Sequence, residues 1–376
     1  MNETRWYKIT PADSWFFRDS RPANAGEDQS DLHSIFPPHP QTVVGAIRAA
    51  LARTLGWQCG EWNPSIKAKL GDGFEDVSPL RFTPSMLAIE CEERFPRRGL
   101  QLLFTSPRHL LGEVSVDCEV NGEHQPVFCP RDWLRPSGSK FSTDMGQVYL
   151  PMFPAQADRS NSKQLQTADG FFITTTGMQS VLDGKLPDAM EFIHHSCLYA
   201  IENRVGIDRN RENRSMYSPG HVRLVDGVSI VIGIGGPSGE LPEAFPLGGE
   251  SRQAVCKPLT TPPKLPESRS GSCVVLTTPA RWEHCWYGAG PGKSAKELHP
   301  SLIANVTTCT VDRPTRIGGF DSRTTHSQAL SSYCPAGSVW WLDAVVSPAD
   351  NEPCLAVGLR NSLGYGVAFI GHSPET

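Results

Sequence analysis

Apolar side chains recur at helical spacing between residues 41 and 56. They stand at every fourth position, namely Val43, Ile47, Leu51 and Leu55. Pro40 suits the first helical position and Gly56 suits a left-handed stop, so the pattern predicts an amphipathic helix. Arg48 and Arg53 fall off its apolar face.

The rest of the first half alternates between strand and helix patterns. Strands are predicted at 6–10, 100–104, 113–120, 199–208 and 221–234, and a second helix at 171–186. Residues 58–90 are polar and expected to be irregular, and the strands at 100–104 and 113–120 could form a hairpin. The order strand, helix, two strands, helix, strand is that of a ferredoxin-like unit with a large insertion before its last strand.

A Gly- and Pro-rich stretch at 235–239 is the best domain boundary. Beyond it the pattern predicts strands at 273–277, 306–311, 337–346 and 367–370, and short helices at 294–303 and 354–363. We therefore expect an α+β protein with two ferredoxin-like (RRM-like, βαββαβ) domains, residues 1–236 and 245–376. A chain of 376 residues with 39% hydrophobic content can bury two cores.

Composition narrows the possible functions. The net charge is only −5, whereas a free-standing nucleic-acid-binding protein is usually basic. Any RNA contact must therefore use local arginine patches, or partners must supply positive charge. Arginine far outnumbers lysine, and its planar guanidinium suits bidentate phosphate contacts and stacking on bases.

Cysteine usage and hydropathy indicate the compartment. The 11 cysteines are scattered singly from Cys59 to Cys354, with no C-x-x-C pair. They are typical of reduced thiols, without a disulfide framework or a zinc site. No apolar run approaches the roughly 20 residues that span a bilayer, and the first residues lack a signal-peptide pattern. We expect a cytoplasmic protein with no membrane contact and no metal or other cofactor.

The segment before the first helix is the first candidate binding site. An aromatic run from Trp15 to Phe17 would fix a strand whose end carries Arg18 and Arg21 into a proline-bounded loop. Both arginines would then meet the start of the helix, where free N–H groups and the helix dipole favour anions. No catalytic acid, base or nucleophile accompanies them, and residue types alone favour an ordinary strand, loop and helix with solvated arginines.

The sequence of this segment resembles that of a known family. FFRDSRP followed by FPPHPQTVVGAIRAAL is similar to the amino-terminal signature of the Cmr subunit three family, RAMP-superfamily proteins of type III-B CRISPR effector complexes. The resemblance continues through the later segments ENRVGID, HVRL, LGGESR, TTPA, IGGFD and PAGSV, in the same order. It therefore covers most of the chain.

Two later stretches add candidate RNA contacts. Arg204 begins a locally basic loop that also holds Arg209, Arg211 and Arg214, and Tyr217 beyond it could stack on a base. Near the end, the glycines at 364, 366 and 371 are similar to a reduced form of the RAMP glycine-rich loop. Glycines let a backbone approach nucleic acid closely and offer N–H donors to phosphates.

Two rival interpretations are catalytic. Residues 288–294, GAGPGKS, are one residue short of a phosphate-binding loop that would use Lys293, and no buried strand precedes them. His194 and His195 allow a RAMP-type endoribonuclease that processes repeat RNA, because some relatives cut RNA with a histidine, but no paired carboxylates accompany them. A surface loop and a packed histidine pair are the simpler explanations.

The resemblance implies a non-catalytic RNA-binding subunit in antiviral defence. It would bind the 5′ repeat-derived tag of the crRNA, dock to the large polymerase-cyclase-like subunit and to the backbone RAMP subunit, and meet target RNA indirectly. The expected RNA-binding residues are Arg18, Ser20, Arg21, Gly45, Arg48, Arg204, Arg209, Arg211, Arg214, Tyr217, Gly249, Arg252, Gly364, Tyr365 and Gly366. No catalytic or metal-binding residue is expected.

Overall fold

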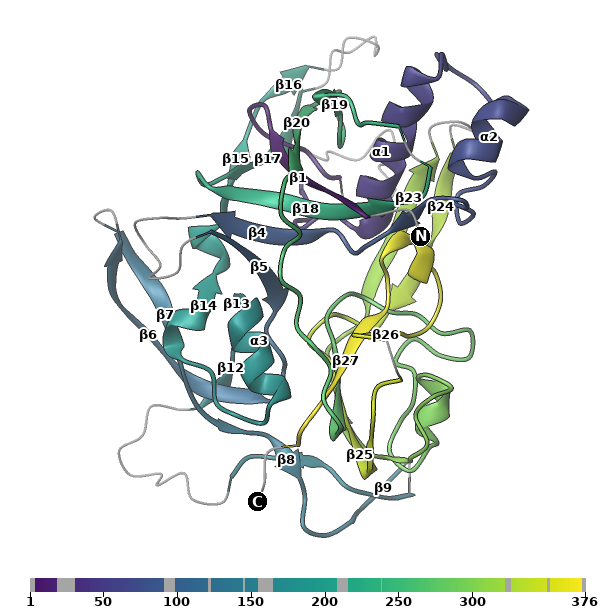
Figure 1. Cartoon of the computed structure of the whole chain (residues 1–376). Coiled ribbons are helices and arrows are strands. Elements are labelled where there is room, and N and C mark those ends of the chain that lie inside the picture. The colour runs from purple at the N-terminus through teal and green to yellow at the C-terminus, as the bar shows by residue number, and fades with distance from the viewer. Residues whose placement is uncertain are drawn as a thin grey trace.

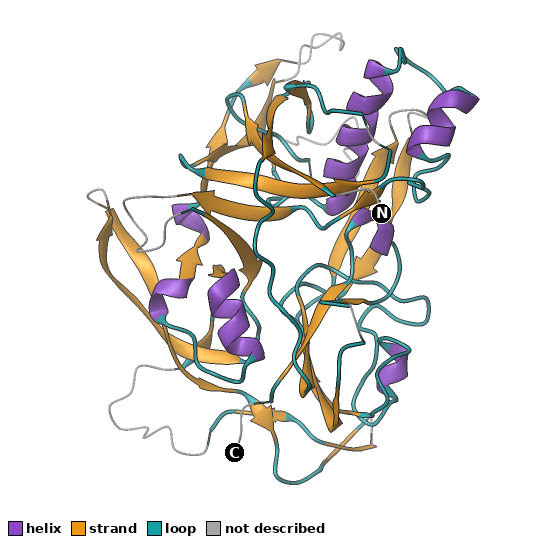
Figure 2. Cartoon of the chain, in the orientation of Figure 1, coloured by secondary structure: helices purple, strands orange, loops and turns teal. Residues whose placement is uncertain are grey.

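The computed structural model is mixed and rich in strands, which agrees with the expected α+β class (Figures 1 and 2). It describes residues 4–18, 31–90, 99–120, 123–144, 146–154, 165–207, 216–237, 239–321, 326–349 and 352–373. Within these residues no helix is long and apolar enough to cross a membrane.

A large sheet crosses the molecule (Figure 1). Its hydrogen-bonded order is β14-β13-β5-β4-β18-β1-β20-β19, and β3 also pairs with β18. The strands are β1 (Arg5–Pro11), β3 (Arg81–Phe82), β4 (Met86–Glu90), β5 (Leu100–Thr105), β13 (Phe171–Thr174), β14 (Phe192–His194), β18 (Val228–Gly235), β19 (Ala244–Pro246) and β20 (Gln253–Leu259). Since β1 and β4 are both antiparallel to β18, they run parallel to each other, with helix α1 (Pro40–Thr54) between them in the chain.

A smaller sheet is formed by the last third of the chain, in the order β22-β25-β21-β27-β26. Its strands are β21 (Gly271–Leu276), β22 (Val306–Thr310), β25 (Val339–Val346), β26 (Leu355–Ala356) and β27 (Val367–Gly371). β19 and β20 lie beyond the expected boundary at 236–245, yet they pair within the large sheet. The division between the two sheets therefore falls between Leu259 and Gly271.

Alternating side chains divide the interior into layers. On β1, Tyr7 packs toward α1, whereas its neighbour Trp6 faces the small sheet. On β25, Trp341 joins that same inter-sheet core, whereas Trp340 packs on the outer face of the small sheet. Because side chains alternate along a strand, each sheet supplies two apolar faces, and the two sheets share one core.

Several further strand pairings, of which β6–β7 is long, surround these layers. They are β2 (Asp31–Leu32), β15 (Tyr199–Asn203) and β16 (Gly206–Ile207) on β17 (Met216–Leu224); β7 (Glu123–Trp133) and β12 (Gln166–Thr167) on β6 (Leu110–Val120); β8 (Arg135–Pro136) with β11 (Pro151–Met152); β9 (Phe141–Thr143) with β10 (Gly146–Val148); and β23 (Thr315–Asp321) with β24 (His326–Tyr333). The single strand predicted at 221–234 is thus divided by a turn into the end of β17 and most of β18.

The helices confirm one prediction and correct others. α1 begins at Pro40, and Gly56 follows it with a φ of 91°. The stretch expected to be irregular holds a second helix, α2 (Pro64–Leu70), in which the Asn63 side chain accepts a hydrogen bond from the N–H of Ile66. The helix expected at 171–186 is shorter, because β13 occupies its first residues and α3 (Thr175–Leu182) the rest. The described chain also has single 3-10 turns at η1 (Ala189–Glu191), η2 (His195–Cys197), η3 (Ala295–Glu297) and η4 (Asn361–Leu363).

One expected strand pairing and two expected helices are wrong. β5 pairs with β4 and β13, whereas β6 pairs with β7 and β12, so these strands form no hairpin together. The helices expected at 294–303 and 354–363 reduce to η3 and to β26 with η4. β4 lies in the stretch expected to be irregular, and no element was predicted where β7 stands, so the pattern offered neither strand as a partner.

Candidate functional site

A cleft of about 1010 Å³ brings together segments from three parts of the chain. Its walls are the aromatic segment at 16–18, α1, the turn at 248–249 and the β23–β24 pair, which lies beside α1 in Figure 1. Four residues expected from the sequence line it: Arg18, Gly45, Arg48 and Gly249. The structure therefore gathers residues of separate motifs at one place.

The aromatic segment holds Arg18 at the edge of the cleft. Trp15, Phe16 and Phe17 are buried, and the N–H of Phe17 donates to the Ser34 hydroxyl at 3.1 Å. The buried rings fix the backbone, so the next side chain, Arg18, emerges exposed. The segment is not the expected strand, since only isolated bridges at Trp15 and Arg18 pair it with the chain, and Arg21 lies outside the described residues.

The exposed side of α1 supplies a second positive group. Gly45 is exposed, and no atom lies within 4 Å of the position that a Cβ would occupy there. Two turns further on, the Arg53 guanidinium lies 5.5 Å from the centre of the Trp57 ring, an arrangement of cation–π type. Across the cleft, Phe320 of β23 is 62% exposed.

Arg48 requires a correction, because its side chain is turned into the fold and is only 6% exposed. It donates hydrogen bonds to four backbone carbonyls, those of Leu70, Gly71, Gly73 and Asp76. Its guanidinium also lies 5.0 Å from the centre of the Trp62 ring. Arg48 therefore ties α1 to the segment after α2 and is not a free phosphate ligand.

The first turn of α1 is also covered by the chain itself. The N–H of Thr42 donates to the carbonyl of His39, and Gln41 is buried. An Arg360 nitrogen donates to the side-chain oxygen of Gln41 at 3.4 Å and to the Tyr333 hydroxyl at 3.1 Å. The start of this helix is therefore packed against the C-terminal segment through Gln41.

The C-terminal glycine loop is structural for the same reason. Tyr365 is fully buried, which excludes the base stacking expected of it. A Cβ at Gly364 would lie 2.8 Å from Pro84, and one at Gly366 only 1.8 Å from the carbonyl oxygen of Val357. Both glycines are buried and allow close contact with the protein's own backbone, not with RNA.

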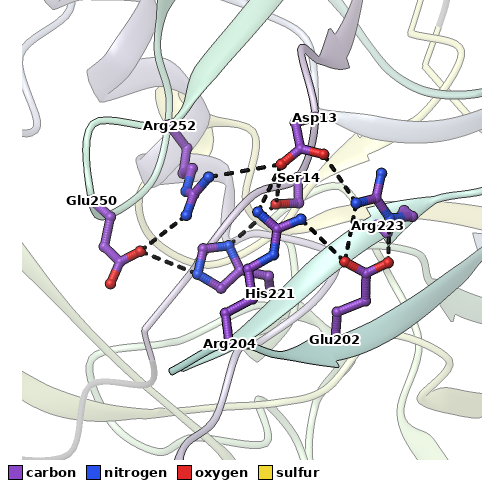
Figure 3. A network of polar contacts seen from close by, with 8 residues as sticks. All are labelled: Asp13, Ser14, Glu202, Arg204, His221, Arg223, Glu250 and Arg252. Atoms are coloured by element: carbon purple, nitrogen blue, oxygen red, sulfur yellow. Dashed lines mark hydrogen bonds and ion pairs between the residues drawn. The ribbon is translucent and has the colours of Figure 1, made fainter. Parts of the chain in front are cut away.

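The other two expected arginines that the structure describes, Arg204 and Arg252, belong to a polar network (Figure 3). Asp13 lies 2.8 Å from Arg204, 3.0 Å from Arg223 and 3.8 Å from Arg252. Glu202 pairs with Arg204 and Arg223 as well. The hydrogen bond from Arg204, joined by one from Arg223, lowers the pKa of Asp13 to about 2.

A buried histidine joins this network to the turn that lines the cleft. His221 is fully buried, its Nδ1 lies 3.2 Å from the Ser14 hydroxyl and its Nε2 lies 3.1 Å from Glu250. Burial lowers the pKa of His221, so the imidazole is neutral at neutral pH, with one ring nitrogen facing Ser14 and the other facing Glu250. Its ring stacks on Phe16 at 5.7 Å. This arrangement links the turn at 248–252 to the aromatic segment.

Other expected residues lie outside what the structure describes. These are Ser20, Arg21, Arg209, Arg211 and Arg214; Tyr217 belongs to β17, but its side chain is likewise outside the description. Sequence reasoning in turn missed Asp13, Arg53, Arg223 and Phe320 as neighbours of the site. Arg223 and Phe320 stood in quoted motifs, HVRL and IGGFD, and Arg53 stood off the apolar face of the predicted helix, whereas nothing in the local pattern indicated Asp13.

The two catalytic alternatives find no support from geometry. The N–H groups of Gly292 and Lys293 donate to the carbonyls of Val306 and Gly290, so they do not point at a phosphate, and only the short η3 follows. The rings of His194 and His195 lie 4.2 Å apart, and neither lines the cleft. In the described part of the chain, no group of three His, Cys, Asp or Glu side chains could hold a metal ion.

Comparison with known proteins found similar solved structures. A solved structure described as the cryo-EM structure of the type III-B Cmr-beta bound to cognate target RNA is similar at 13% identity and a TM-score of 0.43, covering 89% of this chain and 86% of that one. Another, a Csm3-Csm4 subcomplex in the type III-A CRISPR-Cas interference complex, is similar at 9% identity and a TM-score of 0.40, covering 91% and 94%. No curated protein matches the chain.

A family model gives the assignment. The model described as CRISPR-associated protein (Cas_Cmr3) matches residues 7–373, which is nearly the whole chain. This match includes every segment on which the resemblance was based, from FFRDSRP to PAGSV. The protein therefore belongs to the family of the CRISPR-associated protein (Cas_Cmr3).

Proposed function

We propose that this protein is a non-catalytic RNA-binding subunit of a type III-B (Cmr) CRISPR interference complex. In this proposal it acts in the cytoplasm, holds the 5′ repeat-derived tag of the crRNA, and docks to the large polymerase-cyclase-like subunit and the backbone RAMP subunit. Target RNA meets it only through the complex. The observation that carries the proposal is the convergence of Arg18, Gly45 and Gly249 on one cleft.

The chemistry of the cleft suits a single strand of RNA. Arg18 and Arg53 supply positive charge at the exposed rim, where a phosphate keeps part of its hydration. Trp57 and Phe320 supply aromatic surface, and every base can stack on such a surface. A guanidinium beside an aromatic ring combines both kinds of contact.

Gly45 adds an independent argument. A glycine inside a helix costs roughly 0.5–1 kcal/mol relative to alanine. No neighbouring atom in the described chain requires the absence of a side chain at Gly45. Close approach of an external backbone would explain why this position has no side chain.

We further propose that the two sheets correspond to two ferredoxin-like RAMP domains. For the large sheet, the support is the arrangement of β1, α1 and β4 around β18, which is a split βαβ unit. For the small sheet it is the antiparallel order β25-β21-β27 at its centre. The shared core between the sheets makes them face one another.

The absence of catalysis is part of the proposal. Apart from arginines, the described lining of the cleft has two ionisable side chains, His39 and Asp321. Burial lowers the pKa of His39 to about 4, which makes it a weak base at neutral pH. We expect the chain alone neither to cut RNA nor to hydrolyse nucleotide. Turnover that disappears on His194→Ala or Lys293→Ala would contradict this expectation.

A double variant tests the cleft. Arg18→Ala with Arg53→Ala should weaken guide-RNA retention by the assembled complex about tenfold at matched salt, because two phosphate contacts are lost. The slope of log affinity against log salt should also become shallower by about two. Retention is measured by filter binding over a series of salt concentrations.

The matched control is Arg131→Ala on β7, an exposed arginine away from the cleft. It removes one positive charge from the same chain, half of what the double variant removes, and should leave RNA retention unchanged. If the double variant holds its guide RNA as firmly as the control does, the cleft is not the RNA contact.

A further inference from the structure

The Asp13 carboxylate lies where three arginines converge (Figure 3). Arg204 follows β15, Arg223 is on β17 and Arg252 precedes β20, so three separate segments bring their guanidinium groups to one side chain. Several guanidinium groups around one anion are the usual protein ligands of a phosphate group. In this structure a carboxylate of the chain stands at that position.

The charges of the network balance. The three arginines face three carboxylates, Asp13, Glu202 and Glu250. Glu202 pairs with two of the arginines and Glu250 with one, whereas Asp13 is the carboxylate that all three share. Without Asp13, the cluster would have one excess positive charge and an open acceptor position at its centre.

The position is accessible to solvent. The Asp13 side chain is 49% exposed, and those of the three arginines are 28% to 43% exposed. Asp13 lies in the bend that follows β1, outside the sheet hydrogen bonds. Its carboxylate can therefore leave the centre of the cluster without breaking the sheet.

The cluster also adjoins the cleft. Arg252 and Gly249 belong to one turn, in which the N–H of Arg252 donates to the carbonyl of Gly249 at 3.2 Å. Gly249 lines the cleft, and its N–H donates to the carbonyl of Phe16. A strand that leaves the cleft past this turn would meet the three arginines next.

We propose that Arg204, Arg223 and Arg252 form a phosphate-binding subsite, and that Asp13 is its built-in occupant, which an RNA phosphate displaces. The proposal rests on the proposed function only in taking RNA as the source of the phosphate. Arg204 and Arg252 are RNA contacts expected from the sequence. The displacement of Asp13 is a separate step, and it lowers the affinity of the subsite for an RNA phosphate. Asp13 thus acts as a tethered counterion of the subsite.

This role predicts an unusual gain of binding on removal of an acid. Asp13→Asn keeps the shape of the side chain but removes its charge, so a phosphate no longer competes with it. We expect guide RNA to be retained about two- to fivefold more tightly, in line with the modest strength of exposed ion pairs. The salt dependence should become steeper, because salt anions would replace Asp13 and be released on binding.

The experiment compares Asp13→Asn with the parent chain in the assembled complex over a series of salt concentrations. Asp312→Asn is the matched control, because it removes a carboxylate that pairs with an arginine, Arg108, at 2.5 Å. Glu202→Gln is the second comparison; it frees two arginines, not three, and should have a smaller effect. Thermal unfolding of each full chain, with and without inorganic pyrophosphate, measures anion binding independently of RNA.

The outcomes separate the two proposals. Equal or weaker RNA retention by Asp13→Asn than by Asp312→Asn, at unchanged melting temperature, overturns the subsite. If Asp13→Asn does not fold, Arg223→Gln replaces it, and pyrophosphate stabilisation that persists in this variant overturns the subsite. If no variant of the cleft changes RNA retention while pyrophosphate stabilises Asp13→Asn more than the parent, the proposed function fails and the phosphate subsite stands.

Discussion

At the scale of single residues, the arginines of α1 show why residue type alone did not assign roles. Arg48 and Arg53 both fall off the apolar face of the predicted helix. The structure buries Arg48 against four carbonyls and leaves Arg53 exposed at the cleft. The carbonyls belong to the loop after α2, a helix that the sequence pattern did not predict. The prediction included Arg48 but not the carbonyl groups that bind it.

His109 gives a prediction at this scale. It is fully buried between Trp133 and Trp341, with ring centres 4.9 and 5.8 Å away, and burial lowers its pKa to about 3. An unfolded chain has an ordinary histidine with a pKa near 6.5. Below that pH the unfolded state binds a proton that the folded state does not bind, so stability should fall as pH decreases from about 6.5 towards 3. The expected slope is about 1.4 kcal/mol per pH unit.

His109→Phe tests this directly, because phenylalanine retains the aromatic packing and cannot titrate. Urea unfolding of both proteins between pH 7 and pH 5 should show a shallower pH dependence in the variant. The comparison concerns the slope, so a constant difference from imperfect packing does not affect it. Identical slopes would mean that His109 is not the buried titrating group.

At the scale of elements, two glycines separate a binding role from a packing role. Gly45→Ala places a methyl group in open space inside α1 and should raise the free energy of unfolding by roughly 0.5–1 kcal/mol. Under the proposed function the same change should weaken RNA retention, since the methyl group occupies the approach to the helix. Gly366→Ala should instead lower stability by more than about 2 kcal/mol, because its φ is 69° and its Cβ would meet the Val357 carbonyl.

These two variants are each other's controls. Denaturant unfolding gives the stability of each, and filter binding of the assembled complex gives its RNA retention. Gly45→Ala with unchanged RNA retention would remove this face of α1 from the proposed contact. Gly366→Ala with parental stability would mean that the C-terminal loop is not packed as described.

The elements also show what local pattern can predict. α1, β1 and the central strands of the small sheet follow from periodicity, since their apolar faces meet neighbours at regular spacing. The pairing of β5 with β4, and of β6 with β7, did not follow, because β4 lies in a stretch expected to be irregular and no strand was predicted where β7 stands. The cleft was predictable in part: Arg18, Gly249 and Phe320 stand in motifs quoted from the sequence, but Phe320 reaches the cleft through the β23–β24 pair, which no pattern indicated.

At the scale of the whole molecule, the two sheets are bound by a shared core. Residues of β1, β4 and β5 contribute to it from the large sheet, and residues of β21, β25 and β27 from the small one. Separation of the sheets would expose this apolar surface to water, at about 25 cal/mol per Å². We therefore expect the full chain to unfold in one cooperative transition, although the sequence predicts two domains.

Neighbouring tryptophans on β25 make this cooperativity testable. Trp341 faces the shared core and Trp340 the outer core, where its Nε1 donates to the carbonyl of Ala289 at 3.0 Å. Replacing either tryptophan by alanine should lower the free energy of unfolding by about 3–5 kcal/mol. In native-state hydrogen exchange, Trp341→Ala should lower the protection of amides in β1 and β18 together with those in β21. Trp340→Ala should lower the protection of β21 first. If Trp341→Ala leaves the large sheet as protected as in the parent chain, the sheets are energetically independent, and the segment between Leu259 and Gly271 is a true linker.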